Sequence, residues 1–102
     1  MYNDVLYLGD ERITIDDIGN QIQSIEYGDY KFCEVKSVTR TEFYNASQSG
    51  YKPEIVFVLP DYYDYNNEHF VKYNDVEYQI IRTYRTGTEI ELIAQRYGED
   101  ND

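Results

Sequence analysis

Acidic side chains are the residues of this sequence that are numerous enough to support chemistry. The chain has 20 Asp and Glu residues against 9 Lys and Arg, with one histidine, His69. Paired carboxylates hydrolyse glycosides when they face each other across a cleft, but these acids alternate with apolar residues, as solvated strand faces do. Phosphate loops, dinucleotide fingerprints and nucleophile elbows are absent from the sequence. We therefore expect no enzymatic activity and no cofactor.

One short segment has the oxygen-rich composition of a weak cation site. It offers four oxygen ligands, namely Asp61, Asp64, Asn66 and Glu68. Their spacing differs from that of an EF-hand, and the glycine that bends such a loop is missing. His69 could recruit only carboxylates as further zinc ligands. We predict no resident metal, and weak cation or small-molecule binding by this segment stays an alternative.

The length, the single cysteine and the charge restrict the class of protein. A chain of 102 residues supports one domain, residues 1–102. Cys33 cannot form an intramolecular disulfide, and its apolar neighbours predict a buried side chain. The first 15 residues lack a signal peptide's pattern, and no run approaches the ~20 apolar residues that span a bilayer. We expect a soluble intracellular protein.

A formal net charge of −11 disfavours DNA binding through surface charge. Proteins that grip nucleic acid neutralise phosphates with clustered Lys and Arg, and here the basic residues are scattered. We therefore predict no sequence-specific nucleic-acid binding.

Short alternating runs dominate the sequence and predict an all-β fold. Candidate strands cover residues 5–8, 12–18, 21–27, 30–40, 55–59, 69–73, 76–83 and 88–96. Turns are expected at 9–10, 17–20, 28–29, 74–75 and 85–87, and bulges within 21–27 and at 80–81. Ile13 and Ile15 are expected on the buried face of a half-buried strand. The spacing predicts a small antiparallel β-barrel of about six or seven strands with long exposed loops.

Two segments lack strand periodicity and are predicted to be exposed loops. The longer, residues 41–53, exceeds the usual length of connections in small domains, which indicates a function. We expect its base to be anchored and residues 45–51 to be mobile until neighbours order them. The candidate partner-binding residues of the two loops are Glu42, Phe43, Tyr44, Asn45, Ala46, Ser47, Gln48 and Tyr51, and Asp61, Tyr62, Tyr63, Asp64 and Tyr65. The tail, residues 98–102, is expected to fray.

The run from Glu42 to Gln48 resembles the head-closure, or head-tail joining, proteins of long-tailed bacteriophages and prophages, whose best-known members are the stoppers. In that family an acid, aromatics, an alanine and polar residues follow a strand in this way. Similar segments occur in order at residues 12–15, 71–80 and 90–94, with an aromatic at Phe32. The hairpin turn Asn74-Asp75 departs from the glycine of many relatives but preserves the turn.

The resemblance implies a β-barrel that is soluble in the host cytoplasm and then joins the virion as a ring. Such a ring lies under the portal and adaptor proteins, retains packaged DNA and docks tail proteins. In the family, the loop that corresponds to residues 41–53 reaches toward the central channel of the ring. The resemblance therefore implies that the protein contacts DNA only where DNA fills this channel. It implies no contact with a membrane. Two alternatives stay open: a neighbouring connector role, as adaptor or tail terminator, and an acidic DNA mimic that inhibits a nucleic-acid-binding protein.

Overall fold

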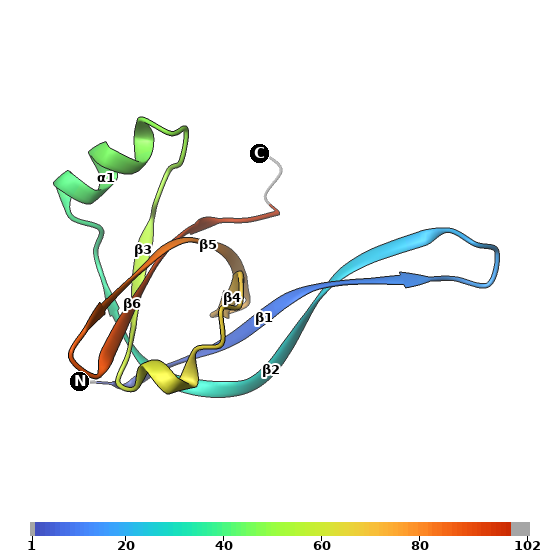
Figure 1. Ribbon diagram of the computed structural model, residues 1–102, viewed down its shortest axis with the longest axis horizontal. Helices are drawn as coiled ribbons and strands as arrows, with labels where there is room; N and C mark the ends of the chain where they lie inside the picture. The colour runs from blue at the N-terminus through green and yellow to red at the C-terminus, as the bar shows by residue number, and fades with distance from the viewer. Residues whose placement is uncertain (1, 99–102) are drawn as a thin grey trace.

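The chain folds into a small antiparallel β-barrel with one short α-helix. The structure is a computed structural model that describes residues 2–98, so most of the tail at 98–102 lies outside the described residues (Figure 1). The elements are β1 (Asp4–Ile15), β2 (Gln21–Lys36), α1 (Arg40–Ser47), β3 (Ile55–Leu59), the 3₁₀ turn η1 (Tyr62–Asp64), β4 (Phe70–Tyr73), β5 (Val76–Thr86) and β6 (Glu89–Arg96). The strands close in the order β1-β2-β3-β6-β5-β4, which confirms the predicted fold class.

The core fills the barrel around Phe57. The ring of Phe57 is fully buried and meets Tyr73 and Tyr78 edge-on, at centroid distances of 5.3 and 5.6 Å. β3, the uninterrupted apolar run between Pro53 and Pro60, is buried from Val56 onward. Cys33 is also fully buried in this core, as its neighbours predicted.

The β4–β5 hairpin has the predicted turn and the predicted bulge. Asn74 and Asp75 have φ angles of 51° and 63°, the left-handed conformation of a two-residue type I′ turn. The register against β6 shifts between Ile80 and Arg82. Tyr78, on β5, lies in the core.

Two predicted turns are wrong, because both glycines lie inside long strands. β1 passes through Gly9-Asp10 and β2 passes through Gly28-Asp29, and the two strands pair from Asp4↔Cys33 to Ile15↔Gln21. The irregularity lies between Tyr7 and Gly9 rather than in residues 21–27, which form a regular ladder, so the bulge predicted there is also wrong. Glycine suits a bulge or a close backbone approach as well as a turn.

β2 pairs with two different strands of the barrel. It pairs with β1 up to Cys33 and then with β3 over Glu34–Lys36. Its strand structure ends at Lys36, short of the predicted end at residue 40.

The outer halves of β1 and β2 project from the barrel as a two-stranded arm (Figure 1). We define the arm as residues 10–15 and 21–27 with the connecting turn. The turn at 17–20 is confirmed: Gly19 donates to the Asp16 carbonyl at 3.1 Å, and Asp16 Oδ1 accepts the Asn20 amide at 2.8 Å. The expected burial of Ile13 and Ile15 is wrong, since 59% and 70% of their surfaces are exposed.

Candidate functional site

Residues 41–47 of the predicted long loop belong to the helix α1, whose N-cap is Thr39. Thr39 is extended, and its Oγ1 accepts the Glu42 backbone N–H at 3.1 Å. The Thr-x-x-Glu spacing is a sequence signal for a helix start that the loop prediction missed. The helix of eight residues follows directly from it.

The end of α1 is closed by a Schellman-type arrangement around Gly50. The Tyr51 N–H donates to the Ala46 carbonyl at 3.1 Å, and the Gly50 N–H donates to the Ser47 carbonyl at 3.0 Å. Gly50 has a φ of 87°, the left-handed conformation that glycine adopts without steric cost. The prediction of a loop without regular structure is therefore wrong for this stretch, whereas the expected mobility of residues 45–51 stays a prediction.

The two sides of α1 differ in character. Glu42 points toward β5, where a carboxylate oxygen lies 3.4 Å from an Arg82 guanidinium nitrogen. Asn45 and Ala46 share that side, as the i, i+3, i+4 spacing dictates. Together with Ser49, Tyr51, Ile81 and Arg82, these three residues line a cleft of about 230 Å³ between α1 and β5.

The opposite side of α1 presents aromatic residues to solvent. Phe43 and Tyr44 are exposed over 45% and 63% of their surfaces, and no residue of α1 is buried. The Ser47 hydroxyl donates to the Tyr44 carbonyl at 2.8 Å, and Gln48 is exposed. The helix is therefore held by its caps and one ion pair, and its aromatic side is available to a partner.

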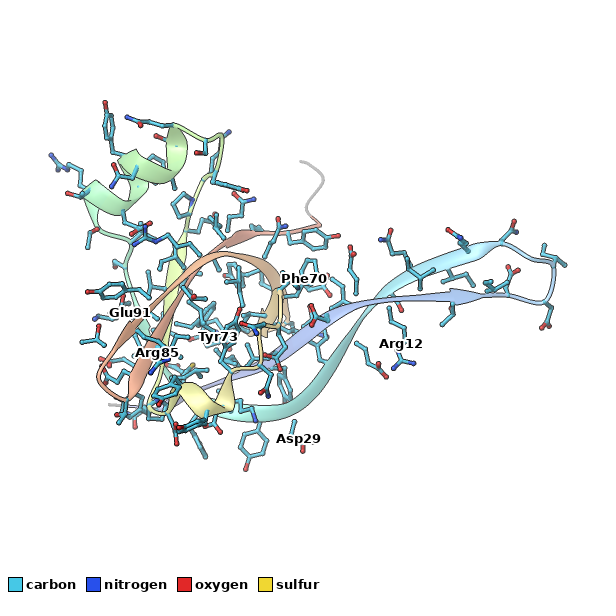
Figure 2. All side chains as sticks on the ribbon, in the orientation of Figure 1. Arg12, Asp29, Phe70, Tyr73, Arg85 and Glu91 are labelled. Atoms are coloured by element: carbon cyan, nitrogen blue, oxygen red, sulfur yellow. The ribbon has the colours of Figure 1, made fainter. Side chains whose placement is uncertain are left out.

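The second candidate segment, residues 61–65, packs across one end of the barrel. Tyr62 and Tyr65 pack against the core. The Arg85 guanidinium lies 3.5 Å from the centre of the Tyr62 ring, a cation–π contact next to η1 (Figure 2). Tyr63 stacks beside Tyr62 and is 75% exposed. Of the three tyrosines, Tyr63 is the one whose surface is open to a partner.

The carboxylates of this segment are engaged by backbone amides. Asp61 Oδ1 accepts the Tyr63 N–H at 2.9 Å, and Glu68 Oε1 accepts the Asn66 N–H at 2.7 Å. Asp64 is half-buried within η1. Within residues 2–98, no group of three or more His, Cys, Asp or Glu side chains is arranged to hold a metal ion. Among the same residues, no helix has the length and apolar character needed to cross a membrane.

His69 joins the arm to the barrel. Its Nδ1 lies 2.7 Å from Asp10 Oδ1, and its backbone N–H donates to the same oxygen at 3.1 Å. It precedes β4, and its carbonyl accepts the Ile80 N–H at 2.8 Å, which extends the β4–β5 ladder by one step. The predicted strand at residues 69–73 thus begins one residue later than expected, at Phe70.

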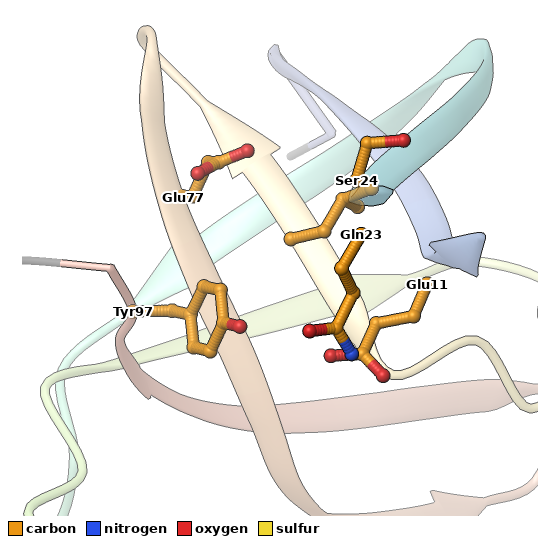
Figure 3. Close-up of a pocket in the computed structure, with 6 residues that line it drawn as sticks. Glu11, Gln23, Ser24, Glu77 and Tyr97 are labelled. Carbon is orange, nitrogen blue, oxygen red and sulfur yellow. The ribbon is translucent and has the colours of Figure 1, made fainter. Parts of the chain in front are cut away.

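A cleft of about 310 Å³ lies where the arm meets the barrel (Figure 3). The arm contributes Glu11, Gln23, Ser24 and Ile25, and the barrel contributes Glu77 and Tyr97. Beside it, the Tyr27 hydroxyl donates to Glu77 Oε2 at 3.0 Å. Burial, followed by this hydrogen bond, raises the pKa of Tyr27 well above its ordinary value.

Two further groups titrate outside their ordinary ranges because they are desolvated. Burial, with a smaller effect of Asp4, raises the pKa of Cys33 to about 12. Burial, with smaller effects of Glu68 and Asp10, raises the pKa of Tyr65 to about 12, and its hydroxyl donates to the Glu68 carbonyl at 2.7 Å. Both groups are therefore protonated at neutral pH.

The arm is the feature that sequence reasoning missed. Its alternating isoleucines were interpreted as one side of a packed sheet, but they lie on a ribbon of two strands. A signal was available: the run from Asp10 to Tyr27 alternates on both sides of a single turn without the bulky apolar runs found in β3 and β6.

Comparisons with known proteins support the fold. No family model matches the chain, and no curated protein matches it. Among solved structures, the chain is similar to the solution structure of protein SF1141 from Shigella flexneri 2a, with a TM-score of 0.73 and 16% sequence identity. The similarity covers 97% of this chain and 96% of that one. At this level of identity the likeness shows a shared fold and nothing further.

Proposed function

We propose that this chain is a connector component of a phage or prophage virion. It assembles as a ring under the portal–adaptor complex, closes the head to retain packaged DNA and docks the tail. Its partners are copies of itself, portal or adaptor proteins and tail proteins. It resides in the host cytoplasm before assembly and at the head–tail junction afterwards.

The observation that carries the proposal is the aromatic side of α1. The segment from Glu42 to Gln48 is the part of the sequence that resembles head-closure proteins. Within it, Phe43 and Tyr44 are exposed and do not contribute to the core. Aromatic residues are enriched where proteins meet. A capped helix that carries two exposed aromatics on a barrel suits a surface that is covered upon assembly.

The acidic composition supports the same proposal. A ring multiplies the charge of −11 on each subunit and surrounds its channel with negative potential. Such a lumen repels the phosphate backbone, so DNA passes without adhering. A neighbouring connector role, as adaptor or tail terminator, would use the same properties.

The DNA-mimic alternative rests on the charge alone. A mimic needs carboxylates in a stripe that repeats the phosphate spacing of about 3.4 Å per strand. In β1, the acids at positions 10 and 11 are followed by Arg12, which pairs with Glu26 at 2.6 Å across the arm. This pairing interrupts an acidic stripe on the arm.

The test uses the phage or induced prophage that encodes the chain. Deletion of the gene should give heads that lose DNA and fail to join tails, with complementation by the wild-type chain. Tailed particles that retain DNA without this chain would refute the connector role. Within complemented phage, Phe43→Ser with Tyr44→Ser should lower the titre at least tenfold.

A matched control separates the aromatic surface from general effects of losing an aromatic. Tyr30 is 55% exposed and lies on β2, outside α1. Tyr30→Ser should leave the titre unchanged. An equal decrease of the titre in both variants would contradict a specific role for α1. The connector role itself is tested separately by the gene deletion.

A further inference from the structure

The arm is a β-ribbon whose two outer edges have no strand beside them in the described residues. β1 pairs with β4 only from Tyr7 to Gly9, and β2 reaches β3 only at Glu34–Lys36. A two-stranded ribbon alone is marginally stable in water, and open strand edges promote pairing with other chains. An arm of this length, about 20 Å at 3.3 Å per residue from Asp10 to Ile15, is therefore expected to contact another molecule.

One face of the arm, which we name the apolar face, carries three isoleucines together with Glu11, Gln21 and Gln23. The register pairs Glu11 with Ile25 and Ile13 with Gln23, so Ile13, Ile15 and Ile25 lie on the same face. Ile18, in the turn that connects the two strands, is 80% exposed. The opposite face carries Ile22 among polar residues, including the Arg12–Glu26 ion pair (Figure 2). The apolar face is the side that a partner would cover.

The arm is also strongly acidic. Residues 10–27 contain five acids and one arginine, a formal net charge of −4. Its arginine is already paired with Glu26. Charge complementarity therefore calls for an apolar groove with basic residues at its rim.

The cleft between α1 and β5 is partly apolar and includes a basic residue. Its apolar lining consists of Ala46, Tyr51 and Ile81, beside the polar Glu42, Asn45, Ser49 and Arg82, and its volume is about 230 Å³. Arg40 begins α1 and Lys52 follows Tyr51, so both flank the cleft along the chain. Among residues 2–98, neither forms an ion pair.

The segment of sequence that contains α1 is slightly basic, unlike the chain as a whole. Residues 40–52 and Arg82 contain three bases and one acid, a formal net charge of +2 in a chain of −11. Glu42, the acid, is paired with Arg82. Arg40 and Lys52 are thus the cations left for an acidic partner.

The arm tip and the cleft lie at opposite ends of the molecule. In Figure 1 the arm extends along the longest dimension of 47 Å, and α1 lies beyond the barrel on the other side. The arm of one copy therefore cannot reach its own cleft. Contacts between two different surfaces of identical subunits are head-to-tail and generate rings or filaments.

We propose that the apolar face of the arm docks into the α1–β5 cleft of the next copy of this chain. Ile13 and Ile15 enter the contact, and the acids of the arm face Arg40 and Lys52 of the neighbour. In the proposed function, this contact would be the interface between neighbouring subunits of the ring. Its role in a virion therefore rests on the proposed function. The contact itself is a property of the isolated protein.

The first test measures self-association by NMR between about 20 µM and about 1 mM, the weak end of specific affinities. Amide signals of the arm face and of the cleft should shift together with concentration. Ile13→Ser with Ile15→Ser should weaken association at least tenfold. Ile22→Ser is the matched control, because it changes the same residue type on the other face of the arm, and it should associate as the wild type does.

The second test distinguishes head-to-tail docking from symmetric pairing. Ser49→Glu places an acid at the cleft rim and should also prevent association, whereas Thr88→Glu, an equal change at an exposed turn, should not. A mixture of the arm variant and the Ser49→Glu variant should form heterodimers and nothing larger, since one intact arm meets one intact cleft. Thermal unfolding of each variant verifies that the barrel is folded.

The proposal is overturned if the wild type shows no concentration-dependent shifts up to about 1 mM, or if the arm variant associates as the wild type does. A mixture that stays monomeric overturns it too. These results leave the connector role standing, because gene deletion tests that role separately. The converse combination is that the variant mixture forms heterodimers while deletion of the gene leaves the phage unaffected. That pair of results would support the contact and reject the connector role.

Discussion

Gly9 is placed where the barrel ends and the arm begins, and its lack of a side chain is structurally required. A Cβ atom at this position would lie 2.5 Å from the Glu26 carbonyl oxygen and 2.6 Å from a ring carbon of Tyr27. The neighbouring backbone is held in the β1–β2 ladder, so it cannot move away without cost. The glycine thus permits the close approach of the two strands at the bulge.

The substitution Gly9→Ala should therefore destabilise the protein by about 1–3 kcal/mol, as overpacking in a fitted site does. Gly28→Ala is the control, because its Cβ would be no nearer than 4.0 Å to the Leu8 carbonyl oxygen. Urea unfolding measures both. Equal stability of the two variants would show that the strands separate more easily than the packing indicates.

Cys33 gives the stability a dependence on alkaline pH. The thiol has an ordinary pKa of 9.0, and burial raises its pKa in the folded chain to about 12. The unfolded chain therefore loses this proton first, so the contribution to stability is complete below pH 9 and falls as the pH rises toward 12. The raised pKa of Tyr65 acts in the same direction above its ordinary value of 10.0.

We expect the free energy of unfolding to fall between pH 8 and pH 10, with at most about 1.4 kcal/mol per pH unit from each group. Cys33→Ala should lower the free energy of unfolding at both pH values, because it creates a cavity. The decrease in this free energy from pH 8 to pH 10 should be smaller in the variant than in the wild type. Urea unfolding at the two pH values provides the comparison. An identical loss in both proteins would contradict a desolvated thiol.

At the scale of elements, α1 depends on its caps because it buries no residue. The Thr39 hydroxyl accepts the Glu42 N–H, and removal of such a cap costs about 1 kcal/mol. Thr39→Ala should therefore loosen α1 while the barrel stays intact. Hydrogen exchange of the amides of residues 43–47 should accelerate about fivefold.

Thr41→Ala is the control for this prediction, since Thr41 lies within the same first turn and caps nothing. Its amide exchange should match that of the wild type. If Thr39→Ala also leaves the exchange unchanged, α1 is held by its contact with β5 rather than by its cap.

The elements that local sequence determines were predicted correctly. Asn74-Asp75 specifies its hairpin because both residues tolerate positive φ angles, and the apolar run of β3 can only be a buried strand. Ile80-Ile81 marks a bulge because two adjacent apolar residues cannot both face the core of a regular strand. In each case the deciding physics lies within a few residues.

The elements that depend on distant contacts were predicted less well. Gly9-Asp10 and Gly28-Asp29 have the composition of turns, and only the pairing of β1 with β2 makes them parts of strands. The sequence shows that Ile13 and Ile15 share a face, but not whether a sheet covers that face. The helix at 40–47 was predictable from its Thr-x-x-Glu start signal, although its eight residues are too few for a clear periodic pattern.

For the whole molecule, the uneven distribution of charge has two opposing consequences. In the proposed contact, the acidic arm and the cations Arg40 and Lys52 attract each other between copies over short distances. The net charge of −11 makes whole subunits repel each other over longer distances. Salt screens the long-range term first, because close charge pairs are screened less.

Ring assembly should consequently weaken at low ionic strength. At 0.01 M salt the screening length is about 30 Å. This length is comparable to the subunit dimensions of 47 × 30 × 21 Å, so the net charges of neighbouring subunits repel each other with little screening. At physiological salt the length falls to about 8 Å, and the local attraction dominates. Ring formation on isolated portal–adaptor complexes, measured by sedimentation across this range, should increase from low to physiological salt. Stronger assembly at low salt would contradict the prediction and indicate that a basic surface of the portal or adaptor, rather than the neighbouring copy, organises the ring.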